Sequence, residues 1–141
     1  RRIFCVSAAI AAVAQAALAP SSRNSKSSQF IIVEDKDLLV RMSKMRDYGS
    51  GLLEGAAAAI VVLGDTAKTD LWLDNAAISA TYLLLSATDS GLGSCWVHVN
   101  GRPMVRKDPS QGTAEEYLKT ILPYADGLKP LCVIALGYPA E

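Results

Sequence analysis

The chain has 141 residues, half of them hydrophobic, and its 14 basic and 14 acidic side chains give a formal charge of zero. This length suits a single domain over residues 1–141, and no apolar run reaches the roughly 20 residues of a membrane-spanning helix. The basic residues form no stripe, which argues against nucleic-acid binding. We therefore expect a cytoplasmic protein that contacts neither membrane nor nucleic acid.

The N-terminal segment admits two interpretations. The Ala-rich stretch that follows Ser7 predicts a helix over residues 7–18 that packs against a sheet. With the arginine pair in front of it and an A-x-A sequence behind, the same stretch is also typical of a secretory signal peptide, whose mature domain would start at Pro20. Gln15 interrupts the apolar run, and proline directly after a cleavage site hinders processing, so the helix is the favoured interpretation.

A polar loop separates this helix from a short apolar strand predicted over residues 30–33. The loop runs from Pro20 to Lys26 and carries hydroxyl groups, the amide of Asn24 and two cations. Hydrogen-bond donors and positive charge beside a sheet edge suit a polar, anionic, planar ligand. An ordinary turn after a helix stop is the alternative interpretation.

Helices and strands alternate along the rest of the chain. Apolar residues at helical spacing from Asp35 predict a helix that ends before Gly49. The continuous apolar run over residues 58–63 is typical of a central strand covered on both faces, and residues 70–90 predict a long helix that is apolar almost all round. The later elements are expected to be a strand at 94–99, a loop at 101–112, a short helix at 114–122 and a strand at 131–136.

The three cysteines are scattered, and no C-x-x-C pair occurs. With His98 as the single histidine they do not complete an ordinary zinc site, so we expect no metal. Cys95 and Cys132 fall in predicted strands, where we expect buried thiols. His98 also lies in a strand, and we expect it to be structural, with proton donation by its imidazole as the alternative.

Six segments, in this order and spacing, resemble the FMN-dependent nitroreductase-like flavoproteins. Helix and strand alternation by itself predicts a three-layer α/β/α sandwich with parallel strands. The resemblance implies instead an α+β fold of three α/β/α layers around a mostly antiparallel four-stranded sheet, completed as an intertwined homodimer. The segments are Arg1-Arg2, Pro20–Lys26, Ala59–Asp65, Trp72–Ile78, Gly91–Val97 and Ile134–Pro139.

The resemblance implies FMN as the cofactor and assigns its polar contacts. The loop that begins at Pro20 would bind the ribityl hydroxyls and the pyrimidine edge through Ser21, Ser22 and Asn24. Lys26 would lie at the N1–C2=O side and stabilise the anionic reduced flavin. A solvated loop lysine is the alternative for Lys26.

The FMN phosphate would be bound by Arg1 and Arg2, because a guanidinium fork gives paired charge-assisted hydrogen bonds. A solvated N-terminal pair is the alternative. Two departures from the family pattern weaken the expected site. Ile3 replaces a serine after the arginine pair, and Ser27-Ser28 stands where Pro-Trp is usual, which removes an aromatic wall.

The resemblance also places one strand beside the reactive ring. Cys95, Trp96, Val97 and His98 would pass along the isoalloxazine, with a backbone amide near His98 bonded to flavin N5. No side chain is then the catalytic group, since hydride passes from NADH or NADPH to flavin N5 and on to a small-molecule acceptor such as a nitroaromatic or a quinone. Other substrates for the same flavin, and a flavin-binding module without turnover, are the alternatives.

Overall fold

The computed structural model describes residues 2–140, with side chains from Cys5 onward, so the predicted contacts of Arg1 and of the Arg2 side chain lie outside the described residues. Helices alternate with strands as expected, and three short 3-10 helices lie in the connections. The elements are α1 (Arg2–Ala16), η1 (Ser22–Asn24), β1 (Ser28–Val33), α2 (Lys36–Met42), η2 (Gly51–Gly55), β2 (Ala58–Asp65), α3 (Trp72–Asp89), β3 (Gly93–His98), η3 (Pro109–Gln111), α4 (Ala114–Ile121) and β4 (Leu128–Gly137).

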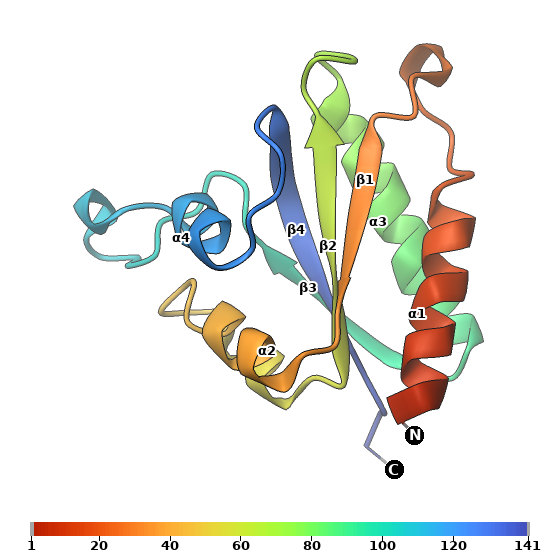
Figure 1. The fold of residues 1–141 in the computed structure, drawn as a ribbon, viewed down its shortest axis with the longest axis horizontal. Coiled ribbons are helices and arrows are strands. Elements are labelled where there is room, and N and C mark those ends of the chain that lie inside the picture. The colour runs from red at the N-terminus through yellow and green to blue at the C-terminus, as the bar shows by residue number, and fades with distance from the viewer. Residues whose placement is uncertain (1, 141) are drawn as a thin grey trace.

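The four strands form one sheet in the order β1-β2-β4-β3, and every neighbouring pair is antiparallel. Helices α1 and α3 cover one face of the sheet, and α2 and α4 cover the other (Figure 1). The three-layer sandwich is confirmed. The antiparallel sheet that the family resemblance implied is correct, and the parallel sheet that alternation suggested is wrong.

The lengths of the connecting helices explain the strand directions. Helices α2 and α4 have seven and eight residues, which is too short to carry the chain back along the sheet, so each next strand starts near the end where the previous one stopped. Helix α3 has 18 residues and is about 27 Å long. It returns the chain along the whole sheet, which makes β2 and β3 parallel, although β4 lies between them.

Strand β2 is the centre of the core, and all but its last residue are buried. Successive side chains of a strand point to opposite faces. Ile60 and Val62 therefore pack with α1 and α3, while Val61 and Leu63 pack with α2 and α4. Burial on both faces, predicted from the apolar run, is confirmed.

Helix α1 begins earlier than predicted. Ser7 is exposed within the helix and does not start it. Cys5, Ala9, Ala12 and Ala16 fall at helical spacing and are all buried in the core shared with α3. This apolar stripe outweighs the capping preference of a serine, so the N-terminal segment forms a packed helix.

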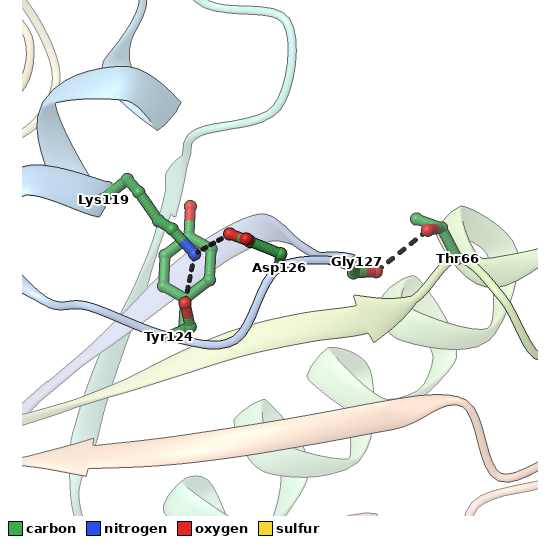
Figure 2. A network of polar contacts seen from close by, with 5 residues as sticks. All are labelled: Thr66, Lys119, Tyr124, Asp126 and Gly127. Carbon is green, nitrogen blue, oxygen red and sulfur yellow. Dashed lines mark hydrogen bonds and ion pairs between the residues drawn. The ribbon is translucent and has the colours of Figure 1, made fainter.

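A small polar network fixes the turn that precedes β4 (Figure 2). The Lys119 ammonium donates to the backbone carbonyl of Tyr124, lies 4.2 Å from the centre of its ring and stands 3.3 Å from the Asp126 carboxylate. Thr66, in the turn after β2, donates its hydroxyl to the carbonyl of Gly127 at 2.9 Å. The Lys119 contacts join α4 to this turn, and the Thr66 bond joins the turn to the end of β2. Across the described residues, no helix combines the length and apolarity that crossing a membrane requires.

Candidate functional site

The loop predicted to bind the cofactor has an unusual backbone. Arg23, Asn24 and Lys26 have φ angles of 51°, 53° and 49°, a left-handed conformation that side chains other than glycine rarely adopt. The Lys26 amide donates to the Ser21 hydroxyl at 3.0 Å. Such backbone persists only where contacts with the surrounding structure stabilise it, so another part of the protein has to hold the loop.

Asn75, in the first turn of α3, holds the loop. It is 3% exposed. Its Oδ1 accepts the Ser22 amide at 3.0 Å, and its Nδ2 lies within 3.3 Å of the hydroxyl oxygens of Ser22, Ser25 and Ser27. One buried amide therefore ties four points of the loop to the central helix. The sequence analysis missed Asn75, although a polar amide on the buried face of a largely apolar helix is a visible signal.

The predicted ligand residues of the loop divide into two groups. Ser21 and Ser22 already make hydrogen bonds inside the protein, Ser21 to Lys26 and Ser22 to Asn75 and Thr69. The side chains of Asn24 and Lys26 are exposed and make no hydrogen bond within the part of the chain that the structure describes. The exposed amide and ammonium are thus free to bind a ligand, and the hydroxyls shape the loop. Pro20, the first residue of the loop, is exposed and follows the helix end.

The second predicted segment is an edge strand. Strand β3 pairs with β4 alone, and along it Val97 is buried, whereas Trp96 and His98 are half-buried. Cys95 is exposed, so the prediction of a buried thiol is wrong there. The reason is its place: one neighbouring strand and an open edge leave β3 less covered than β2 or β4.

The His98 imidazole is engaged by its neighbour. The Trp96 indole N–H donates to His98 Nδ1 at 3.0 Å, and the two rings stack with their centres 6.2 Å apart. Burial, followed by the positive charges of Arg102 and Arg46, lowers the pKa of His98. A neutral imidazole with an occupied Nδ1 suits a structural role better than proton donation at that nitrogen.

The His98 backbone, in contrast, faces the open edge. The Val99 amide donates to the Leu131 carbonyl of the neighbouring strand. Since alternate residues of an antiparallel pair turn their backbone groups toward and away from the partner, the peptide groups of His98 point outward. Its carbonyl indeed accepts from Arg46 Nη1 at 3.1 Å, which leaves the His98 amide as a donor at the edge.

The two predicted halves of the site are not brought together within one copy of the chain. The loop precedes β1, and the His98 segment ends β3, which lie at opposite edges with β2 and β4 between them. Three strand spacings amount to about 14 Å. Each half offers the donors that a flavin ring needs, an exposed amide and ammonium in one and an outward backbone N–H in the other. The residues fit FMN as two half-sites.

The sequence and the fold were compared with those of known proteins. The family model described as "Nitroreductase family" matches residues 43–138. A protein of Archaeoglobus fulgidus called "Putative NADH dehydrogenase/NAD(P)H nitroreductase" is 32% identical over 130 residues, which cover 89% of this chain and 69% of the relative. A protein of the same description from Methanothermobacter thermautotrophicus is 28% identical, over 86% of this chain and 60% of its own length.

Among solved structures, the fold is similar to that of an FMN-dependent nitroreductase of Clostridium difficile. The TM-score is 0.89 and the sequence identity is 34%, and the match covers 96% of this chain and 76% of the other. The similarity therefore extends over nearly all of the fold. The matched parts leave roughly a quarter to two-fifths of each of these three relatives outside the comparison.

Proposed function

Because the chain belongs to the nitroreductase family, we propose that it is an FMN-dependent NAD(P)H oxidoreductase that reduces nitroaromatics, quinones or related small acceptors. The names of its relatives support FMN and a nicotinamide reductant. The observation that carries the proposal is the pair of half-sites: a loop fixed by Asn75 that exposes Asn24 and Lys26, and an edge strand that exposes the His98 amide. A cytoplasmic location remains part of the proposal.

The chemistry that FMN supplies when bound is hydride transfer at N5, from NADH or NADPH and then to the acceptor. The protein binds and orients. Asn24 and Lys26 would hold the pyrimidine edge, and the Lys26 cation would stabilise negative charge near N1. The His98 amide would be the donor for N5, and the backbone of Cys95, Trp96 and Val97 would contact the ring.

Arg1 and Arg2 complete the proposed cofactor contacts at the phosphate, where the guanidinium fork suits a dianion. Ser21 and Ser22 act on the same cofactor mainly through the loop, since their hydroxyls are bonded inside it. The Ser21 hydroxyl accepts an N–H and keeps its own proton to donate to a ribityl oxygen, whereas the Ser22 hydroxyl is shared between Asn75 and Thr69. The protein groups that would contact the reactive atoms of the flavin are therefore backbone and loop groups.

A second copy of the chain is proposed to complete the site. The exposed side of α3 carries several large apolar residues among polar ones such as Asp74 and Thr81: Leu73, Ile78, Tyr82 and Leu85 are 36–64% exposed, and Ile10 on the neighbouring α1 is 58% exposed. An apolar surface over two packed helices marks an interaction site. We propose that this face packs against its equivalent in a homodimer, which brings the loop of one copy to the β3 edge of the other.

Complementation tests this composite site. Asn24→Ala removes a loop donor, whereas His98→Pro removes the outward amide at a position where an edge strand tolerates proline. His98→Ala, which keeps the amide, is the matched control and should retain FMN-dependent NADPH oxidation. Each lesion alone should lower that activity, and refolding the two variants together should restore about a quarter of the sites in a two-fold symmetric dimer. No restoration in the mixture would show that both halves act within one copy.

The flavin-binding module without turnover is the second candidate. Ser27-Ser28 in place of Pro-Trp, together with Ile3, favours it, but both serines are used structurally, Ser27 by Asn75 and Ser28 by Ser79 at 3.0 Å. The loop is therefore held without the aromatic pair. NADPH oxidation that depends on an added nitroaromatic or quinone separates an enzyme from a module that only binds FMN.

A further inference from the structure

The loop over residues 101–112 is docked on the turn that follows α2. The Asp47 amide donates to the Met104 carbonyl at 2.8 Å. The Asp47 carboxylate accepts the Arg106 amide with both oxygens at 3.2 Å, and the Arg106 guanidinium lies 5.6 Å from the centre of the Tyr48 ring. These contacts join segments almost 60 residues apart in the chain and fix the position of the loop relative to Arg46.

This docking gathers three arginines. Arg46 is half-buried, and Arg102 and Arg106 are exposed. The Arg102 amide donates to the carbonyl of Val99, the residue after His98, and the His98 carbonyl accepts from Arg46. Burial first, and then the charge of Arg102, lower the pKa of Arg46, with Arg106 acting in the same direction. The charge of the Asp47 carboxylate acts in the opposite direction and raises the pKa of Arg46.

The arginine cluster, defined as Arg46, Arg102 and Arg106, has more positive charge than its surroundings neutralise. None of the three forms an ion pair with a carboxylate among the residues whose side chains are described. Asp47 is already bonded to the Arg106 amide, and Asp108 accepts from Ser110 and Gln111 instead. Like charges fixed close together destabilise the fold, and a bound anion offsets that repulsion.

The cluster also lies at the proposed reaction face. Arg46 Nη1 donates to the His98 carbonyl, and both Arg46 and Arg102 act on the charge of the His98 imidazole. The His98 amide is the group proposed to face flavin N5. An anion held by the cluster would therefore sit beside the reactive edge, where an acceptor or the reductant has to bind.

We propose that Arg46, Arg102 and Arg106 form an oxyanion site that binds a carboxylate or phosphate of a reactant, which makes anionic reactants the preferred ones. The assignment rests on the proposed function, since it names the reactant class of that same site. Two reactants have an anionic group that this site would bind: an acceptor with a carboxylate, and NADPH with its 2′-phosphate. Guanidinium groups suit both, because their forked donors match the oxygens of either group.

Arg102→Gln tests the site, because the Arg102 side chain makes no hydrogen bond or ion pair within the described part of the chain and its loss should leave the fold intact. Lys129→Ala, which removes an exposed cation on β4, is the charge-matched control. With NADH as reductant, the KM for 4-nitrobenzoate should rise about fivefold in Arg102→Gln, while that for the neutral 4-nitrobenzamide stays unchanged. With 4-nitrobenzamide as acceptor, a rise in the KM for NADPH but not NADH assigns the site to the reductant.

A binding measurement tests the oxyanion site without requiring turnover. In the FMN-loaded protein, whose cofactor-phosphate site is filled, inorganic phosphate should raise the melting temperature of the unaltered protein and of Lys129→Ala, and the rise should shrink in Arg102→Gln and vanish in Arg102→Gln/Arg106→Gln. An equal rise in all four proteins, together with unchanged KM ratios, overturns the oxyanion site. Failure to reduce 4-nitrobenzamide with either nucleotide would contradict the proposed function instead, and the phosphate titration would still test the cluster.

Discussion

Replacement of Asn75 by alanine should weaken the protein and release the loop that it holds. The change removes the bond to the Ser22 amide and the two N–H donors that the hydroxyl oxygens of Ser22, Ser25 and the fully buried Ser27 share. A hydrogen bond contributes about 0.5–1.5 kcal/mol net, and a buried group left without a partner costs about 1–3 kcal/mol. We expect the free energy of unfolding to fall by about 2–4 kcal/mol, since two of the four partners are solvated enough to find water.

Chemical denaturation measures that loss, and for a chain of this size it lowers the melting temperature by about 6–12 °C. Ser79→Ala is the matched control: it is buried on the same helix and removes the single bond to Ser28, so about 1 kcal/mol is expected. Hydrogen exchange of the Ser22 amide should speed up in Asn75→Ala alone, and FMN affinity should fall with it. Equal stability of the two variants, with unchanged exchange at Ser22, would refute the role assigned to Asn75.

Three further predictions concern the core and the β4 turn. Gly64→Ala should lower the free energy of unfolding by about 1–3 kcal/mol, because its Cβ would stand 2.4 Å from a ring carbon of Trp72. In the folded protein a thiol reagent should modify Cys95 and leave Cys132 intact, since burial raises the pKa of Cys132 to about 12. Burial, with the charge of Glu115 adding to it, raises the pKa of Tyr124 to about 12. The contribution of the neutral Tyr124 side chain to the free energy of unfolding should therefore be complete below pH 10, the usual pKa of the group, and disappear as the pH rises to about 12.

Each of these has a control in the chain. Gly55→Ala adds a Cβ with no atom within 4 Å, and it also reduces the entropy of the unfolded chain, so a loss as large as that of Gly64→Ala would contradict the Trp72 clash as the cause. Modification of Cys132 at the rate of Cys95 in native buffer would contradict the packed core. Tyr124→Phe should flatten the alkaline fall in stability, and an unchanged slope would assign the fall to other groups.

The sequence is sufficient to predict the layers and the central strand, because both depend on local patterns. The apolar run of β2 has no polar face, so burial on both sides follows directly. Strand direction is different: it depends on whether a connection crosses the sheet. The sequence predicts the short α4, but it predicts a helix that continues from Asp35 almost to Gly49, whereas α2 has only seven residues. The exposure of Cys95 depends in the same way on the edge position of β3.

Some parts of the candidate site can likewise be predicted from the sequence, and others cannot. The loop with Asn24 and Lys26 is recognisable from residue types and from the family resemblance. The role of Asn75 is not, because its four contacts lie 48–53 residues earlier in the chain and exist only after α3 packs beside β1. The arginine cluster likewise depends on docking between segments that the sequence does not place together.

The most direct test of the central claim is the visible absorption spectrum of the purified protein, supplied with FMN and then with NADH or NADPH in the absence of oxygen. The account predicts a bound-flavin spectrum that bleaches on addition of the nucleotide and returns when a nitroaromatic or quinone is added. A protein that takes up no FMN, or holds FMN that neither nucleotide bleaches, would contradict the account.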